Sequence, residues 1–405
     1  MESSDIKAIL DSSDRMVAAV DMTYRRYLCR QIDWRDRLIC LKGPKGTGKT
    51  TLLLQHIREA FGVRSERAVY LAADNIWFSS HDIMDAVDYF HSHGYTHLFI
   101  DEVHQLPEWS KVIKTITDTY PQLNVVFSGS SILKLSKGSA DLSRRQAVYD
   151  LKGLSFREFL SLEGELGHDP VTLADIRKSH RRIAGGIADR IKVLPLFRRY
   201  LKEGYYPMYR SVSSQFADRL SEIVSNVLET DVPAVMDVTP ATIRKAKKML
   251  MILAGNCPQT PNMTDLYREL ETDRNAGIKM FGMLEAAELV STVRSSLSEP
   301  KLKRLGTVEK VFLGDSNLMN ALVPEPNAGA VRETYFVNQL TAGGHKVVAP
   351  KQGDFIVDGR HLFEVGGKGK GFDQIKDLDD SYVVNDDVEV GFGNKIPLWL
   401  FGFLY

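Results

Sequence analysis

Cysteine is scarce in this chain of 405 residues, and its three copies (Cys29, Cys40 and Cys257) are widely spaced, with no C-x-x-C pair. This argues against a disulfide framework or a cysteine-ligated metal site, and it is typical of a reducing compartment. An excess of charge of one sign is also lacking, because 52 Lys and Arg residues balance 52 Asp and Glu residues. No overall field therefore draws the protein toward nucleic acid or membrane, and any basic surface must be local.

Long hydrophobic runs are missing as well. The first five residues are acidic and polar, unlike a signal peptide. The longest late apolar run, residues 396–405, is too short to span a bilayer, and we interpret it as a buried final strand. The ten histidines are scattered and form no zinc-ligand spacing and no nucleophilic triad. We therefore expect a cytoplasmic protein that makes no membrane contact.

The most specific motif present is the phosphate-binding loop G-x-x-x-x-G-K-[ST], which residues 43–50 match without a mismatch. Glycines adopt positive φ and leave space for phosphate, so the backbone N–H groups can point inward at the positive end of the next helix. Lys49 would reach the β- and γ-phosphates, and the Thr50 hydroxyl would bind Mg²⁺. The predicted nucleotide-binding residues are Gly43, Pro44, Lys45, Gly46, Thr47, Gly48, Lys49, Thr50 and Thr51.

A second motif follows about 50 residues later, where the apolar run 97–100 ends in Asp101 and Glu102. This is the Walker B arrangement, in which carboxylates emerge at the carboxyl end of a buried strand. Asp101 would hold Mg²⁺, directly or through water, and Glu102 would orient and polarise the attacking water. The pair turns a nucleotide-binding loop into a candidate hydrolytic site.

Two further positions each leave an alternative open. The run 123–131 predicts a strand that carries a polar sensor near the γ-phosphate, with Ser128 as first choice and Ser130 as rival. The alternative is an ordinary strand-to-helix turn with a serine cap. Arg145 is a candidate arginine finger that would act on the nucleotide of a neighbouring copy in a homo-oligomer. The alternative is a surface arginine pair with Arg144.

Together these motifs resemble the prokaryotic AAA+ ATPases that carry a C-terminal domain of unknown function. The likeness also includes the block Leu-Ser-Phe-Arg-Glu-Phe-Leu at 154–160 and the segment 200–207, where Tyr205 stands in place of a frequent second glycine. The resemblance implies ATP as the nucleotide, and the absence of a guanine motif [NT]-K-x-D agrees with it. It also implies a helical lid over residues 155–235 that closes over the nucleotide.

The middle of the chain predicts a winged helix. Three short helical patterns, at 243–253, 262–270 and 273–287, precede two strand-like runs at 289–293 and 309–313. Such a domain can place its third helix in the DNA major groove, with Arg274 and Lys279 facing phosphates or bases. Basic residues of the wing would assist, namely Lys301, Lys303 and Arg304. The alternative is a winged helix that packs only against protein.

Residues 320–405 predict a small α/β domain that resembles a PD-(D/E)xK nuclease core. A strand pair around Asp358-Gly359 carries Asp354 and Glu364, and Glu333 lies in a predicted helix. These three acids form a possible second Mg²⁺ site. The lysine expected two residues after Glu364 is replaced by glycine, so Lys368 would have to substitute for it from a glycine-rich loop.

We therefore predict an α/β fold with four domains: a P-loop AAA+ core (1–154), a helical lid (155–235), a winged helix (236–315) and a nuclease-like α/β domain (320–405). The expected function is Mg²⁺-dependent ATP hydrolysis coupled to engagement of DNA or another partner by the C-terminal half. The alternative is a nucleotide-gated switch whose nuclease-like domain cleaves nothing.

Overall fold

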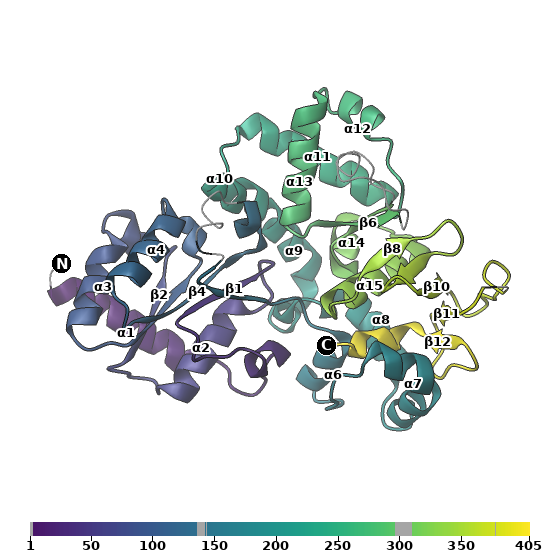
Figure 1. Cartoon of the computed structure of the whole chain (residues 1–405), viewed down its shortest axis with the longest axis horizontal. Helices are drawn as coiled ribbons and strands as arrows, with labels where there is room; N and C mark the ends of the chain where they lie inside the picture. Colours follow the sequence, from purple (N-terminus) through teal and green to yellow (C-terminus); the bar gives the residue numbers. More distant parts are fainter. Residues whose placement is uncertain (1–2, 136–141, 143, 296–309, 377) are drawn as a thin grey trace. The chain divides into compact units, whose positions relative to one another are not determined.

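The computed structural model describes residues 3–135, 142, 144–295, 310–376 and 378–405. The chain forms two compact units (Figure 1). The first comprises Met1–Lys152 and Asn226–Pro240, and the second comprises Gly153–Ser225 and Ala241–Tyr405. The stretch Asn226–Pro240, called the returning segment below, thus belongs to the first unit although the chain on both sides of it belongs to the second.

A five-stranded parallel sheet forms the centre of the first unit, with the strand order β2-β3-β4-β1-β5. Its strands are β1 (Leu38–Gly43), β2 (Ala68–Ala72), β3 (His97–Asp101), β4 (Asn124–Ser130) and β5 (Ala147–Asp150). Because β4 lies between β1 and β3, its carboxyl end is next to both the phosphate loop and the acids that end β3. The strands predicted before the phosphate loop, before Asp101 and around Ser128 are confirmed.

Helices cover both faces of this sheet, and alternate strand residues point to opposite faces. Ile39 and Leu41 pack in one apolar cluster with α2 (Lys49–Ala60), whereas Leu38 and Cys40 pack in another with α3 (Ile83–Ser92) and α4 (Trp109–Thr119). Helix α1 (Ser3–Ala19) contributes Ile9 to the second cluster and Val17 to the first. Cys40 is buried in the core, as predicted.

The returning segment contains a π-helical turn, Val227–Asp231, and the short helix α10 (Val232–Val235). Val232 is fully buried, and Val235 packs against the same apolar cluster as α3 and α4. Helix α10 also lies against the short 3₁₀ turns Val103–Gln105 and Ser131–Leu135, which follow β3 and β4. The predicted boundary between lid and winged helix at residue 235 falls inside this segment.

The second unit contains a seven-stranded mixed sheet with the order β12-β11-β10-β9-β8-β6-β7. The two predicted wing strands pair antiparallel, as β6 (Val290–Ser295) and β7 (Lys310–Leu313). Strand β6 also pairs in parallel with β8 (Val347–Ala349), so the ribbon is part of the larger sheet. The remaining strands are β9 (Phe355–Val357), β10 (His361–Gly366), β11 (Ser381–Asn385) and β12 (Lys395–Pro397).

The predicted hairpin near residue 358 is confirmed, since β9 and β10 pair antiparallel. Its turn residues, Asp358 and Gly359, both have left-handed φ values, 53° and 74°. Two successive positive φ angles define the tight turn that Asp-Gly favours in hairpins. The turn places Asp354, which directly precedes β9, beside β10, which carries Glu364.

The helices of the second unit include the predicted set in the middle of the chain: α11 (Pro240–Asn256), α12 (Met263–Glu269) and α13 (Arg274–Ala286). The others are α6 (Phe156–Leu162), α7 (Leu173–Ala188), α8 (Val193–Arg199), α9 (Phe216–Asn226), α14 (Ser316–Leu322) and α15 (Ala328–Ala342). Helix α6 begins with a capping box between Ser155 and Glu158, and its aromatic face is buried as predicted. Within the described residues, no helix combines the length and apolar character needed to cross a bilayer.

The end of the chain differs from the prediction of a final strand. Only Lys395–Pro397 is extended, and Leu398–Phe403 forms a 3₁₀ helix. Pro397 has no N–H group to donate to a sheet ladder, and its φ of −62° suits the residue that precedes a helix. The run is buried as expected, with Trp399 and Phe401 almost completely inaccessible.

Candidate nucleotide-binding site

The phosphate loop connects β1 to α2, and its glycines meet two separate demands. Gly46 and Gly48 have φ values of 88° and 94°, which L side chains rarely adopt. At Gly43 the limit is space, because an added Cβ would lie 2.2 Å from the carbonyl oxygen of Leu151. Gly48 precedes the first residue of α2, so the free N–H groups of that helix face the loop. The motif therefore has the strand, loop and helix context that phosphate binding requires.

Lys49 is the first residue of α2 and is 96% buried, with a relative exposure of 4%. Its ammonium group donates to the carbonyl oxygens of Gly43 and Pro44, each at 3.1 Å. The Thr47 hydroxyl also donates to Pro44, at 2.9 Å. These bonds hold the Lys49 ammonium group against the carbonyl groups of the phosphate loop.

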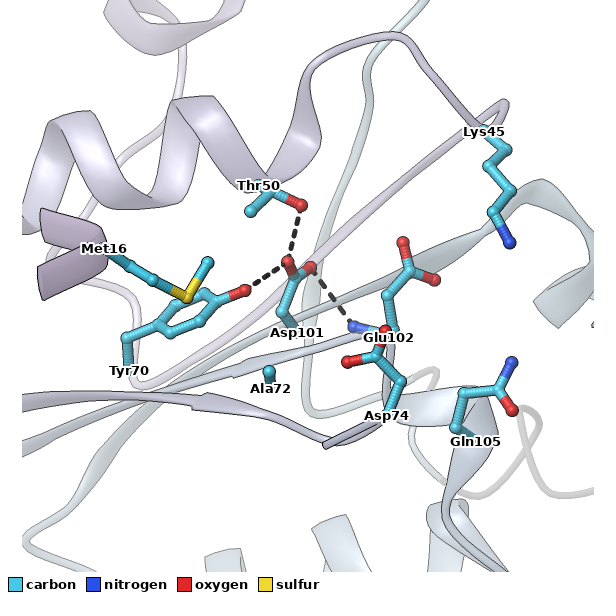
Figure 2. A pocket seen from close by; sticks show the side chains of 9 residues that line it. All are labelled: Met16, Lys45, Thr50, Tyr70, Ala72, Asp74, Asp101, Glu102 and Gln105. Atoms are coloured by element: carbon cyan, nitrogen blue, oxygen red, sulfur yellow. Dashed lines mark hydrogen bonds between the residues drawn. The ribbon is translucent and has the colours of Figure 1, made fainter. Parts of the chain in front are cut away.

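Asp101 accepts hydrogen bonds from three hydroxyl groups on three different elements, and Figure 2 shows those from Thr50 and Tyr70. Thr50 of α2 donates at 2.6 Å, Tyr70 of β2 donates at 2.7 Å, and Ser128 of β4 also donates. The backbone N–H of Glu102 is a fourth donor, at 3.2 Å. The structure thus joins the predicted residues Thr50, Asp101 and Ser128 at the carboxyl edge of the sheet. Ser130, the alternative to Ser128, is buried at the end of the same strand.

Tyr70 was not predicted as a site residue. It lies in β2, which pairs with β3 in a register that aligns Tyr70 with Phe99 and Ala72 with Asp101. Burial first, and the neighbouring Asp101 charge second, raise the pKa of Tyr70 above its ordinary value, so the phenol remains a donor. The only sequence signal was a polar hydroxyl within an apolar strand.

Glu102 lies directly beyond β3 with φ 51° and ψ 42°, a left-handed conformation. For a residue other than glycine this conformation costs about 1–3 kcal/mol and is frequent at functional sites. Burial raises the pKa of Glu102, Lys49 opposes that shift, and Asp101 adds to it. A carboxylate with a raised pKa is better suited to accept a proton than an exposed glutamate.

A pocket of about 260 Å³ opens beside these groups (Figure 2). It brings together residues from the phosphate loop, α1, β2 and the end of β3. Its lining residues are Met16, Lys45, Thr50, Tyr70, Ala72, Asp74, Asp101, Glu102 and Gln105. Polar groups of both signs thus border one space at the carboxyl edge of the sheet, which is where ligands bind in open α/β sheets.

Arg145 lies at the exposed surface of the first unit, where it forms an ion pair with Asp118 of α4. It is not among the residues that line the pocket. Of the DNA-contact candidates, Arg274 and Lys279 are exposed on α13. The predicted wing residues Lys301, Lys303 and Arg304 lie outside the described residues.

The acids of the C-terminal domain are Glu333 of α15, Asp354 directly before β9 and Glu364 of β10, and basic residues accompany two of them. Glu333 is 3.3 Å from Lys310, Glu364 is 2.5 Å from Lys370, and the Asp354 carboxylate accepts from the N–H of Val365 at 2.8 Å. Burial raises the pKa values of Glu333 and Glu364, and the charge of Asp354 adds to both shifts. No cluster of three or more acidic, histidine or cysteine side chains with metal-binding geometry occurs among the described residues.

The structure places a different lysine from the predicted Lys368 beside Glu364. The side chain that reaches Glu364 belongs to Lys370, whereas Lys368 is exposed. The strand does not continue beyond Gly366, so the alternation on which the Lys368 prediction relied ends there. The glycine-rich turn instead folds back and places the Lys370 side chain against Gly366.

Comparison with known protein families agrees with the site described in the first unit. Residues 35–160 match the family model described as AAA domain, and residues 194–328 match a domain of unknown function, DUF8612. The matched AAA segment contains the phosphate loop, Asp101, Glu102 and Ser128. The first unit is therefore built on a P-loop domain of the AAA type, the class of domain that binds nucleotide.

Individual relatives are distant. The uncharacterized protein MJ1637 of Methanocaldococcus jannaschii is 26% identical over 269 residues, which are 63% of this chain and 56% of that protein. The chain thus matches little more than half the length of that relative. A RuvB mutant of Thermotoga maritima shares 15% identity at a TM-score of 0.27, over 75% of this chain and 94% of the other. The Hsp104–ADP complex of S. cerevisiae shares 14% identity at a TM-score of 0.29, over 69% of this chain and 39% of the other. TM-scores of this size do not define a common overall fold.

Proposed function

We propose that the protein is a Mg²⁺-dependent ATPase of the AAA class. The observation that supports this most directly is the 2.6 Å hydrogen bond between Thr50 and Asp101, because it joins the phosphate-loop helix to the end of β3. A hydroxyl and a carboxylate are oxygen ligands of the kind that Mg²⁺ prefers. The two groups fit a cation that also contacts the phosphates.

In this proposal the loop amides and Lys49 bind the triphosphate, and Thr50 and Asp101 hold the metal. Mg²⁺ would neutralise charge on the phosphate oxygens. Glu102 orients the attacking water, and Ser128 holds Asp101 in place next to the γ-phosphate. Arg145 of a neighbouring copy would supply positive charge if the protein forms a homo-oligomer, for which its Asp118 partner would have to be exchanged.

Phosphate release from the purified protein tests the proposal. We expect release from ATP with Mg²⁺ and its loss when EDTA removes the metal. GTP serves as the comparison nucleotide, because ATP specificity rests on the family resemblance alone. A protein that neither binds nor hydrolyses ATP would contradict the proposal.

For the second unit we infer a role in engaging DNA or a protein partner under control of the nucleotide. The exposed Arg274 and Lys279 on α13 and the antiparallel ribbon of β6 and β7 favour a winged-helix type of contact. In the alternative, the C-terminal domain only recognises its partner and the ATP state acts as a switch. The proximity of the Glu333, Asp354 and Glu364 carboxylates supports a second possible role, that of a nuclease centre.

Incubation with linear or branched DNA and Mg²⁺ or Mn²⁺ separates these two roles. If the C-terminal domain is a nuclease, Asp354→Asn loses cleavage, because the amide cannot replace a metal-binding carboxylate but can still accept from Val365. Asp373→Asn, an exposed change nearby, is the matched control. Cleavage that persists in Lys49→Ala and disappears in Asp354→Asn contradicts the pure switch, whereas no cleavage of any substrate contradicts the nuclease.

A further inference from the structure

A series of four charged or titratable side chains, of which the two in the middle are fully buried, connects the phosphate loop to Glu102 through the returning segment. Asp231 lies 3.4 Å from the Lys45 ammonium group and 3.4 Å from Nε2 of His104. Nδ1 of His104 lies 3.4 Å from the Glu102 carboxylate. The side chains of Asp231 and His104 are both fully buried.

The His104 ring lies between two carboxylates, one facing each of its nitrogens. Neither ring nitrogen forms a hydrogen bond of good geometry in the described structure, yet each faces a carboxylate oxygen. A neutral imidazole can donate a hydrogen bond from only one ring nitrogen at a time. The carboxylate that accepts this bond therefore determines whether the ring can also donate to the other carboxylate. A buried polar group of this kind is costly unless its partners are fixed.

Asp231 is fixed by the packing of the returning segment. The adjoining Val232 is buried, and α10 lies against the turn that contains His104. Burial raises the pKa of Asp231, but the neighbouring His104 and then Lys45 outweigh this effect and lower the pKa overall. The carboxylate thus stays charged in the protein interior because its two partners stabilise it.

We propose that Asp231 is a positioning residue of the ATPase site, which links Lys45 to Glu102 through His104 and transmits the nucleotide state to the second unit. This rests on the proposed ATPase function. Lys45 belongs to the phosphate loop, so a triphosphate competes with Asp231 for its ammonium group. Glu102 must turn toward water during hydrolysis, which changes its contact with Nδ1 of His104. Both events act on Asp231, because it contacts Lys45 and His104. The returning segment that carries Asp231 continues into the second unit at both of its ends.

Asp231→Asn tests the proposal, since it preserves shape and removes the charge. We expect affinity for a non-hydrolysable ATP analogue to stay within about threefold, while kcat falls about tenfold to a hundredfold, because Glu102 is no longer held in its productive position. Glu229→Gln, an exposed change in the same π-helical turn, is the matched control and is expected to retain wild-type kcat.

A second readout follows transmission. In the wild-type protein the analogue is expected to slow hydrogen exchange in α9 and α11, which flank the returning segment in the chain. In Asp231→Asn the analogue binds but the change in these helices is lost. His104→Gln is expected to give the same result, and the double variant no further loss, because the two residues act as one unit. If Asp231→Asn does not fold, His104→Gln decides the question.

An active wild-type protein together with variants of unchanged kcat and unchanged exchange response overturns the inference and leaves the ATPase proposal standing. Additive losses in the double variant also overturn it, because they indicate two independent structural defects. A wild-type protein that does not bind ATP overturns both proposals, and that result appears before any variant is made.

Discussion

Lys49→Ala is expected to remove detectable ATP binding and, with it, all ATP turnover. The lysine is buried at the start of α2 and held by two loop carbonyls, so its charge is directed into the phosphate-binding loop. A hydrogen bond to a charged group contributes about 1.5–3 kcal/mol, and two such contacts to phosphate correspond to roughly a hundredfold or more in affinity. Calorimetric titration with ATP and Mg²⁺ measures the loss.

The matched control is Lys111→Ala, which removes a lysine from the exposed surface of the same unit. It is expected to bind ATP as the wild type does, and circular dichroism should show that both variants remain folded. ATP affinity in Lys49→Ala within a few-fold of the wild type would refute the assignment of residues 43–50 as the nucleotide site.

The phosphate loop and the Asp101-Glu102 pair were predictable because each depends on a short contiguous stretch with an obligatory local conformation. Gly46 and Gly48 have positive φ values, which glycine adopts readily. An apolar strand that ends in acids places those acids at the carboxyl edge of the sheet. The helices of the middle domain and the Asp358-Gly359 turn of the C-terminal domain were predictable for the same reason, since both depend on local signals.

Tyr70, His104 and Asp231 could not be found in this way, because their importance depends on which distant elements become neighbours. Tyr70 reaches Asp101 only because β2 pairs with β3, and Asp231 reaches His104 only because the returning segment folds as part of the first unit. The pairing of Glu364 with Lys370 instead of Lys368 could not be predicted for a different reason. A glycine-rich loop does not preserve the alternation of a strand, so sequence spacing does not determine which side chain returns to Glu364.

Glu102→Gln is expected to bind ATP as tightly as the wild type and to hydrolyse it about 10²–10³ times more slowly, which is the usual contribution of a positioned proton acceptor. The amide has nearly the same shape as the carboxylate and leaves Lys49, Thr50 and Asp101 unchanged. What it removes is the negative oxygen that orients water. Because burial raises the pKa of Glu102, kcat of the wild type should fall with acid at a higher pH than an ordinary glutamate would give, and the variant should lack this limb.

Single-turnover hydrolysis and equilibrium ATP binding, measured on the same preparations, separate the two effects. Glu108→Gln is the matched control, because Glu108 also has a left-handed backbone (φ 49°) but is exposed and pairs with Lys111. Its turnover should equal that of the wild type, which would show that replacing a glutamate at a strained backbone position is not by itself harmful. Normal turnover in Glu102→Gln would assign water activation to another group. Weakened ATP binding in that variant would instead mean that the Glu102 charge holds the phosphate loop in place, through His104 and Asp231, before any chemistry begins.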